Sequence, residues 1–153
     1  MLAKLHTNLV ELPARWMSPG ADILALFMRL FVGWQFFKAG QLKIQSWSNT
    51  LELFESTYEV PLLPPYPAAI LGTFGEIAFP LLLCFGLATR LAATGLQIVN
   101  VVAMISVLHF FDDGFANSAY ADHWLWGLML FALMVHGGGR LSTDHLLGRM
   151  RAD

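Results

Sequence analysis

PAAILGTFGEIAFPLLLCFGLATR, residues 67–90, is the stretch that decides the fold. It is about as long as the roughly 20 apolar residues that a membrane-spanning helix needs. Its one ionisable side chain before Arg90 is Glu76, near the middle. Pro80 lacks the N–H that would bond to the Glu76 carbonyl, so a kink is expected there. Because a carboxylate at mid-bilayer costs about 2.5–3.5 kcal/mol on insertion scales, Glu76 has to face protein or water rather than lipid.

The composition of the whole chain indicates a membrane protein. Of its 153 residues, 56% are hydrophobic and 13% are charged, whereas a soluble domain usually carries about 25% charged residues. The single cysteine, Cys84, excludes an intrachain disulfide and a Cys-x-x-Cys redox pair. The N-terminus lacks a basic region followed by an apolar run and a small-residue cleavage site, so we expect no cleavable signal peptide.

Four apolar segments predict an all-α fold, an integral membrane four-helix bundle that forms a single domain over residues 1–153. The expected spans are residues 21–43, 67–87, 91–111 and 119–137. An interfacial N-terminal segment, residues 1–20, is predicted to form a short amphipathic helix bent or ended near Pro13, and a second such helix is expected in the first loop, residues 46–66. The C-terminal tail, residues 138–153, contains a short helix that Ser142 can cap.

Charge is distributed unequally between the two sides of the predicted membrane. Four spans place both termini on one side, together with Lys4, Arg15, Arg90, Arg140, Arg149 and Arg151. The loops on the other side contain Glu52, Glu55, Glu59, Asp112, Asp113 and Asp122. The positive-inside rule therefore predicts cytoplasmic termini and periplasmic loops, in a multi-pass protein of the bacterial cytoplasmic (inner) membrane.

Glu76 needs polar partners from other spans. If each span is centred in the bilayer, Gln35, Glu76 and Asn100 lie at similar depth, with Lys38 about one turn away. Gln35, Lys38 and Gln41 are spaced by three and are expected to share an inward-facing side of the first span. This cluster either joins helices through bonds worth about 0.6 kcal/mol each, or forms a site for a proton or a polar head group around Glu76. For Gln35 and Asn100 the structural interpretation is favoured.

A second set of polar residues flanks the loop before the last span. It consists of His109, Asp112, Asp113, Asp122 and His123. Imidazole and carboxylate groups bind transition metals, but this spacing matches no metal motif, so a metal site is the weaker hypothesis. On an ideal helix Asn100 and His109 point in opposite directions, so the two candidate sites are expected to be separate.

Three segments resemble the DoxX family of small four-span membrane proteins. MRLFVGWQFFKAGQLK, residues 28–43, resembles the family's opening arginine, span glycine and closing lysine. FGEIAFPLLLCFGLATRLAA, residues 74–93, resembles its second-span glutamate and the glycine–leucine–threonine–arginine turn. HGGGRLSTDHLL, residues 136–147, resembles its glycine, arginine, serine and aspartate ending. The resemblance covers about residues 23–147, and the matching positions are Arg29, Lys43, Glu76, Arg90, Arg140 and Asp144. No catalytic residue set common to the family follows from these matches.

The resemblance implies a redox or metal-stress role, because related proteins include the DoxD-type subunit of a thiosulfate:quinone oxidoreductase. The leading hypothesis is an inner-membrane accessory subunit of a redox or stress-response system that hands electrons to quinone. Glu76 would carry the coupled proton, with Lys38 and Gln35 at the head group. Since the chain has no cysteine pair, haem-ligand motif or flavin motif, electrons need a partner subunit, and an autonomous enzyme is not expected.

Two alternatives remain open. One is non-enzymatic binding or transport of a metal or small solute through His109 and His123. The other is a purely structural membrane scaffold. Nothing in the chain resembles a nucleic-acid surface, and the partners expected are the lipid bilayer, a redox subunit and a second copy of the chain. Faces of small residues would suit either packing within the chain or a homo-oligomer; they are Ala68, Gly72, Ala92 and Gly95.

Overall fold

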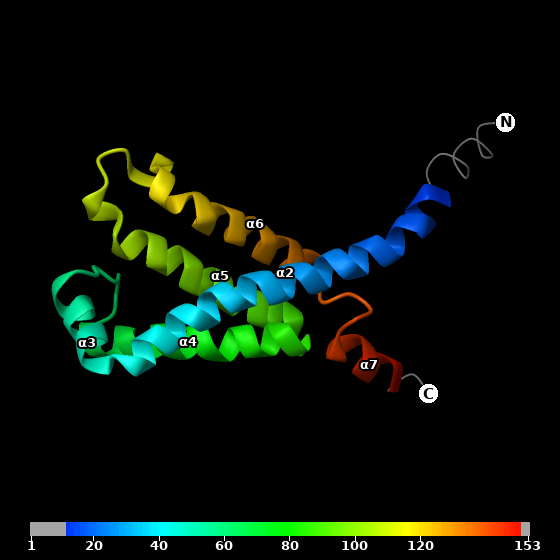
Figure 1. The fold of residues 1–153 in the computed structure, drawn as a ribbon, viewed down its shortest axis with the longest axis horizontal. Coiled ribbons are helices and arrows are strands. Elements are labelled where there is room, and N and C mark those ends of the chain that lie inside the picture. The colour runs from blue at the N-terminus through cyan, green and yellow to red at the C-terminus, as the bar shows by residue number, and fades with distance from the viewer. Residues whose placement is uncertain (1–11, 151–153) are drawn as a thin grey trace.

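The computed structural model of the chain describes residues 12–150, which form α-helices and short 3-10 turns and contain no strand. Four long helices run in alternating directions (Figure 1); they are α2 (Leu12–Gln45), α4 (Pro65–Phe85), α5 (Thr89–Ser106) and α6 (Ala121–His136). Each packs against two neighbours, in the order α2, α4, α5, α6 and back to α2. The predicted all-α class is confirmed, as an antiparallel bundle of four helices.

Three segments of the described chain are long and apolar enough to cross a membrane: Pro19–Gln45, Pro65–Phe85 and Thr89–Phe110. They correspond to the first three predicted spans. The fourth is shorter than predicted, because α6 has 16 residues and residues Ser118–Tyr120 before it form a 3-10 turn, η4. The third predicted span is also interrupted, since α5 ends at Ser106 and a second 3-10 turn, η2, occupies Leu108–Phe110.

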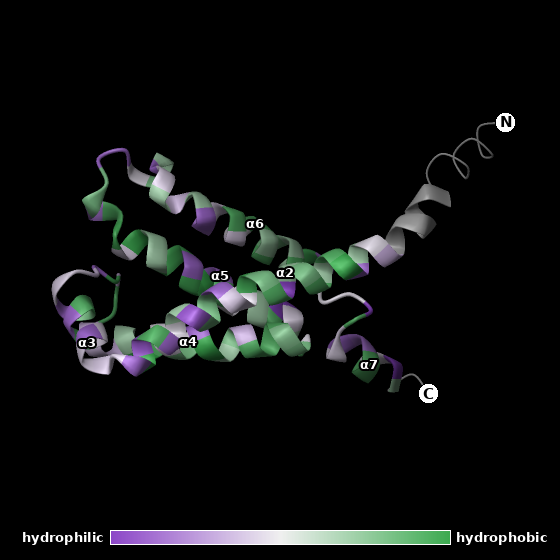
Figure 2. Cartoon of the chain, in the orientation of Figure 1, coloured by the Kyte–Doolittle hydropathy of each residue, from purple (hydrophilic) through white to green (hydrophobic). Residues whose placement is uncertain are grey.

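The distribution of side chains is that of a protein surrounded by lipid. Large apolar side chains with more than half of their surface exposed include those of Phe27, Phe74, Leu128 and Phe131. Three charged or amide side chains of the described residues are buried instead, those of Arg29, Glu76 and Asn100. The helices are apolar over much of their length (Figure 2). Since a soluble protein buries apolar groups and exposes charged ones, this reversal identifies an apolar surrounding.

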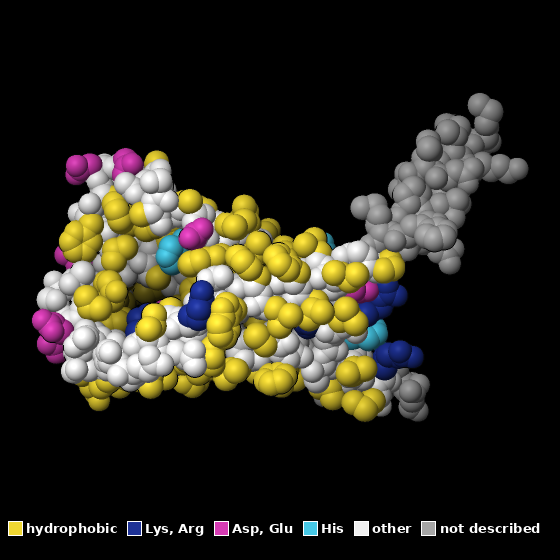
Figure 3. All heavy atoms as spheres, viewed as in Figure 1, with side chains coloured by type: hydrophobic (Ala, Val, Ile, Leu, Met, Phe, Trp, Pro, Cys, Tyr) yellow, Lys and Arg dark blue, Asp and Glu magenta, His cyan; other side chains and the backbone are white. Residues whose placement is uncertain are grey.

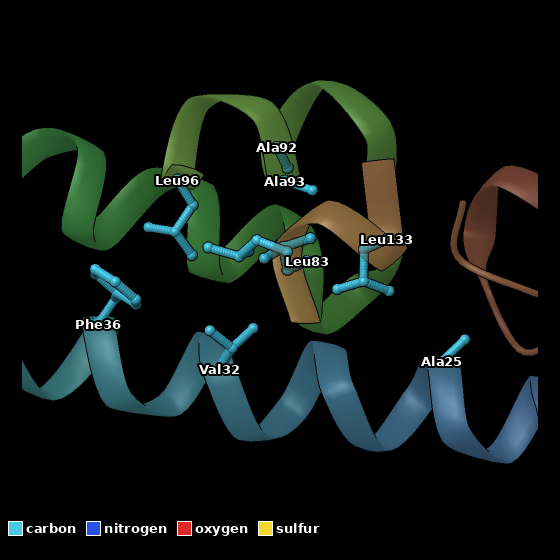
Figure 4. Close-up of a cluster of buried hydrophobic side chains, with 9 residues drawn as sticks. Ala25, Val32, Phe36, Leu83, Ala92, Ala93, Leu96 and Leu133 are labelled. Atoms are coloured by element: carbon cyan, nitrogen blue, oxygen red, sulfur yellow. The ribbon is translucent and has the colours of Figure 1, made fainter. Parts of the chain in front are cut away.

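One compact hydrophobic cluster holds the four long helices together (Figure 4). Val32 and Phe36 of α2 point toward Leu83 of α4 and Leu96 of α5. Leu133 completes the cluster from α6. This core lies in the half of the bundle nearer α7 (Thr143–Met150), and the half nearer α3 (Trp47–Ser56) is more open.

The two short helices confirm two sequence predictions and the N-terminal region corrects one. α3 is the expected helix in the first loop, and α7 is the expected tail helix, in which the Ser142 hydroxyl accepts a 3.3 Å hydrogen bond from the His145 N–H. Of the interfacial segment predicted for residues 1–20, residues 1–11 lie outside the described residues. From Leu12 onward the segment belongs to α2, which continues through Pro13 and Pro19, so the described chain is neither interrupted near Pro13 nor divided from the first span.

The four small residues noted in the sequence are used for packing within the chain. Ala68 and Ala92 are buried. A methyl group on Gly95 would overlap the ring of Phe79, and one on Gly72 would lie 3.6 Å from the ring of Phe54. Of the two uses predicted for these residues, the structure shows the intrachain one.

Candidate functional site

The Glu76 carboxylate is paired with Lys43. Lys43 Nζ donates to both carboxylate oxygens, at 2.8 Å to Oε1 and 2.6 Å to Oε2. The side chain of Glu76 is 8% exposed and that of Lys43 is 22% exposed. Lys38, the partner predicted for Glu76, is exposed instead. The predicted inward face of Gln35, Lys38 and Gln41 is therefore wrong: Lys38 and Gln41 face outward, and only Gln35 is partly buried.

The close approach of α2 to α4 explains why Lys43 is the partner. A methyl group on Gly40 would lie 2.8 Å from Ile77 Cδ1 and 3.0 Å from Glu76 Cβ. A methyl group on Gly33 would lie 3.3 Å from the Cys84 sulfur. Two glycines seven residues apart share a helix face, and Lys43 follows Gly40 by three residues on that face. This glycine spacing was the sequence signal for the true inward face of α2.

The ion pair lies in the wall of a cavity of about 620 Å³. Residues from all four long helices, from α3 and from the segment after α3 line it, and most of these are apolar. Its polar lining residues are Gln35, Lys43, Tyr58, Glu76, Ser106 and His123. Figure 3 shows the molecule hollowed near its α3 end, where this cavity lies. A mostly apolar cavity of about 300–1,000 Å³ with a few polar groups is typical of small-molecule binding sites.

The segment that follows α3 forms part of the cavity wall through Tyr58, Val60 and Leu63. The Glu59 N–H donates a 2.9 Å hydrogen bond to the Ser106 carbonyl, which ties this segment to the end of α5. Next to it, the Tyr58 ring packs edge-on against Phe54, with ring centroids 5.0 Å apart. Burial, and then the negative charge of Glu76, raise the pKa of the Tyr58 hydroxyl. Tyr58 therefore remains a protonated hydrogen-bond donor in the lining.

Asn100 is paired with His123 and not with Glu76. Its amide nitrogen donates to the His123 carbonyl at 3.0 Å, and its amide oxygen lies 2.7 Å from His123 Nδ1. The predicted cluster of Gln35, Glu76 and Asn100 is thus divided between two walls. The predicted separation of the two candidate sites is wrong at His123, which belongs to the second predicted set but pairs with Asn100 and lines the same cavity as Glu76. His109 has other neighbours.

The residues predicted as metal ligands do not gather at one point. His109 Nδ1 is 3.7 Å from a Glu59 carboxylate oxygen, and its ring lies against Phe110. Asp113 accepts a 2.9 Å hydrogen bond from Asn117, while Asp112 and Asp122 are exposed. Within residues 12–150, no three His, Cys, Asp or Glu side chains are arranged to hold a metal ion. The geometry of the described residues therefore does not support the metal hypothesis.

The other positions that match the DoxX pattern meet at the α7 end. Arg29 is 1% exposed, and its Nη2 donates a 2.7 Å hydrogen bond to the Leu141 carbonyl. Asp144 accepts hydrogen bonds from the Ala88 and Thr89 N–H groups, at 2.7 Å and 2.8 Å, and so caps α5. The Asp144 N–H in turn donates to the Gly86 carbonyl at 2.9 Å.

These contacts fix the charge of Asp144. Burial alone would raise the pKa of its carboxyl group, but the hydrogen bonds from Thr89 and Ala88 and the positive charge of Arg29 bring it below the usual value. In the sequence Asp144 is marked only by the family pattern, because the helix that it caps begins 55 residues earlier in the chain.

The two remaining pattern positions are at the surface of the same end. Arg140 donates to Asp22 from its backbone N–H at 2.8 Å and from its Nε at 2.6 Å. Arg90 is exposed, as expected for a residue at the end of a span. Neither residue lines the cavity of about 620 Å³.

The fold and the site together define a small helical membrane protein with an ion pair inside an apolar cavity. The DoxX family profile matches residues 24–109, more than half of the chain. The chain belongs to the DoxX family. It is also 28% identical over 137 residues to an uncharacterized protein of Haemophilus influenzae, an alignment that covers 86% of this chain and 87% of the relative. No solved structure gives a significant match.

Proposed function

We propose that this DoxX-family protein spans the bacterial cytoplasmic membrane four times, with both termini in the cytoplasm. α6 supplies the fourth span, because it runs alongside α2 and α5 and exposes Leu128 and Phe131. In Figure 3 most Asp and Glu side chains lie toward the α3 end and a group of Lys and Arg side chains lies at the α7 end, while other basic side chains lie nearer the α3 end. By the positive-inside rule, this asymmetry supports a cytoplasmic position for the α7 end.

We propose further that the cavity binds a quinone and that the protein is an accessory subunit of a redox or stress-response system. The Lys43–Glu76 pair in the wall of an apolar cavity of about 620 Å³ is the observation that carries this proposal. The ring and tail of a quinone suit the apolar walls. The ammonium group of Lys43 has three N–H donors, so one is left for a quinone carbonyl oxygen.

Glu76 is the group that accepts or releases the proton that accompanies electron transfer. Both Glu76 carboxylate oxygens accept hydrogen bonds from Lys43. The proton that accompanies electron transfer is therefore exchanged inside the ion pair and next to the quinone head group. Cys84 is the one cysteine of the chain, and no cysteine pair can carry electrons. Electrons therefore enter from a partner subunit, and the role assigned to this chain is to hold the quinone.

Extraction of the purified protein tests this function. The wild type, Glu76→Gln and Glu55→Gln would be purified in mild detergent and their quinone content measured by mass spectrometry. Glu55 is an exposed carboxylate of α3 outside the cavity lining, so its variant is the matched control. We expect near-stoichiometric quinone in the wild type and in Glu55→Gln, and a loss of most of it in Glu76→Gln. Absence of quinone from all three samples would overturn the proposed mechanism.

A further inference from the structure

The hydrogen bonds around Asn100 determine the tautomer of His123. The His123 backbone carbonyl can only accept, so the Asn100 group that faces it at 3.0 Å is the amide NH2. This orientation turns the amide oxygen toward His123 Nδ1, 2.7 Å away. Because that oxygen can only accept, Nδ1 carries the proton. In the neutral ring, Nε2 is then a hydrogen-bond acceptor.

His123 lies in the wall of the same cavity as the Lys43–Glu76 pair, but on another helix. The pair is formed between α2 and α4, and His123 comes from α6. Trp126, one turn further along α6, also lines the cavity and holds the imidazole edge-on, with ring centroids 4.8 Å apart. His123 also lines a second cavity, of about 300 Å³, together with Asn100. Among residues 12–150, Nδ1 has a hydrogen-bond partner and Nε2 has none.

The two polar positions differ in what they offer a ligand. At the Lys43–Glu76 pair a ligand finds both a donor and an acceptor, so this position binds a carbonyl oxygen or a hydroxyl group. At His123 the neutral Nε2 offers an acceptor only. A hydroxyl group can donate to it, whereas a carbonyl oxygen would face it lone pair to lone pair.

We propose that His123 is the second polar anchor of the cavity and that it selects the reduced ligand, a para-quinol, over the oxidised quinone. One hydroxyl of the quinol donates to the Glu76 carboxylate and the other to His123 Nε2. Asn100 is a positioning residue, which acts by holding the imidazole in the accepting tautomer. This inference rests on the proposed function, since it names the redox form that the same cavity prefers.

Binding of the two redox forms tests the inference. Decylubiquinol and decylubiquinone would each be titrated, under nitrogen, into the detergent-solubilised full-length protein in a calorimeter. The variant is His123→Asn, whose side-chain amide nitrogen replaces Nδ1 and keeps the bond to Asn100 while nothing replaces Nε2. His109→Asn is the matched control, because His109 is exposed and outside the cavity lining.

We expect the wild type and His109→Asn to bind the quinol roughly tenfold more tightly than the quinone, the effect of about one hydrogen bond. In His123→Asn the ratio of the two affinities should fall to about one, mainly through weaker quinol binding. His123→Gln, whose amide oxygen can reach the place of Nε2, should recover part of the preference and serves as a second variant if His123→Asn does not fold.

The outcomes separate this inference from the proposed function. An unchanged ratio in His123→Asn, or tighter binding of the quinone by the wild type, would overturn the role of His123. If in either case binding still depends on Glu76, quinone binding itself stands. Failure of both forms to bind the wild type would overturn the proposed function and this inference with it.

Discussion

Two basic side chains on one face of α2 have opposite surroundings at the two ends of the bundle. Arg29 and Lys43 are fourteen positions apart, which on a helix is the same face at a separation of about 21 Å. At the α7 end, Arg29 is enclosed and donates to the backbone of the segment before α7. At the α3 end, Lys43 lies in the wall of a cavity and holds the one carboxylate that lines it.

The difference shows where the molecule is built to be rigid and where it has room for a ligand. At the α7 end, Arg29 of α2 donates to the Leu141 carbonyl of the C-terminal segment. From that segment, the Thr143 hydroxyl donates to the Phe85 carbonyl at the end of α4, and Asp144 accepts from the Ala88 N–H. At the α3 end, the backbone hydrogen bond from the Glu59 N–H to the Ser106 carbonyl ties the segment after α3 to the end of α5, beside the cavity. Substitutions at the first end should therefore act on stability, and those at the second on ligand binding as well.

The largest effect is expected for Gly86→Ala at the closed end. Gly86 has φ +66°, and a methyl group there would overlap Arg29 Nη1 and lie 2.7 Å from Ser142 Cβ. Gly114→Ala is the matched control, because Gly114 has φ +58° and no atom within 4 Å of the added carbon. We expect Gly114→Ala to lower the free energy of unfolding by about 1–2 kcal/mol from backbone strain, and Gly86→Ala by about 3–5 kcal/mol because the packing clash is added.

Unfolding of both variants in mixed detergent and SDS micelles, followed by circular dichroism, measures the two losses. Equal losses would mean that the space around Gly86 adjusts easily, and the closed end would then be less tightly packed than the contacts of Arg29 indicate.

The next effect concerns the ion pair at the open end. Lys43→Met and Glu76→Gln should each lower the free energy of unfolding by roughly 2–4 kcal/mol, because each leaves the other partner unpaired in an apolar wall. The double variant should lose clearly less than the two single losses added together. Lys38→Met is the control for the loss of a lysine from α2, and its effect should stay within about 0.5 kcal/mol, since Lys38 is exposed.

The same unfolding assay on the four variants measures this coupling. Additive losses, or a loss in Lys38→Met as large as that in Lys43→Met, would contradict the assignment of Lys43 as the partner of Glu76.

The smallest effect is expected for Asp144→Asn, which weakens the cap of α5. Because the Asp144 carboxylate accepts hydrogen bonds from two N–H groups, loss of its charge should lower the free energy of unfolding by about 1 kcal/mol at neutral pH. Because the folded-state pKa of Asp144 is lowered, its stabilisation is complete above the unfolded-state value of about 3.9 and disappears as the pH falls through the lower folded-state value.

The difference in unfolding free energy between wild type and Asp144→Asn, measured from pH 7 into acid, checks this prediction. It should be constant down to about pH 5 and then shrink toward zero below the usual pKa of an aspartate, about 3.9. Asp112→Asn, at an exposed loop position, is the control for replacing an aspartate by asparagine. A difference that grows in acid would contradict the lowered pKa.

The glycines of α2 show why part of the site escaped sequence reasoning. The polar residues Gln35, Lys38 and Gln41 repeat every three residues, and that repeat suggested an inward face. In the structure the inward face is the one that carries Gly33 and Gly40, because there the backbones of α2 and α4 approach closely. Polarity thus misidentified the buried side, and the residues with no side chain marked it.

The sequence by itself determined the helical class, the membrane character and the need of Glu76 for a polar partner. These follow from composition, from the length of apolar runs and from the cost of an isolated carboxylate in lipid, all of which are local properties. The DoxX resemblance came from the order and spacing of its motifs. The tertiary structure alone decided the partners: Lys43 for Glu76, His123 for Asn100, and the Leu141 carbonyl for Arg29. The physical reason is that a polar group pairs with what comes within about 3 Å of it, and that distance depends on how closely the helices pack and not on the spacing of residues along any one of them.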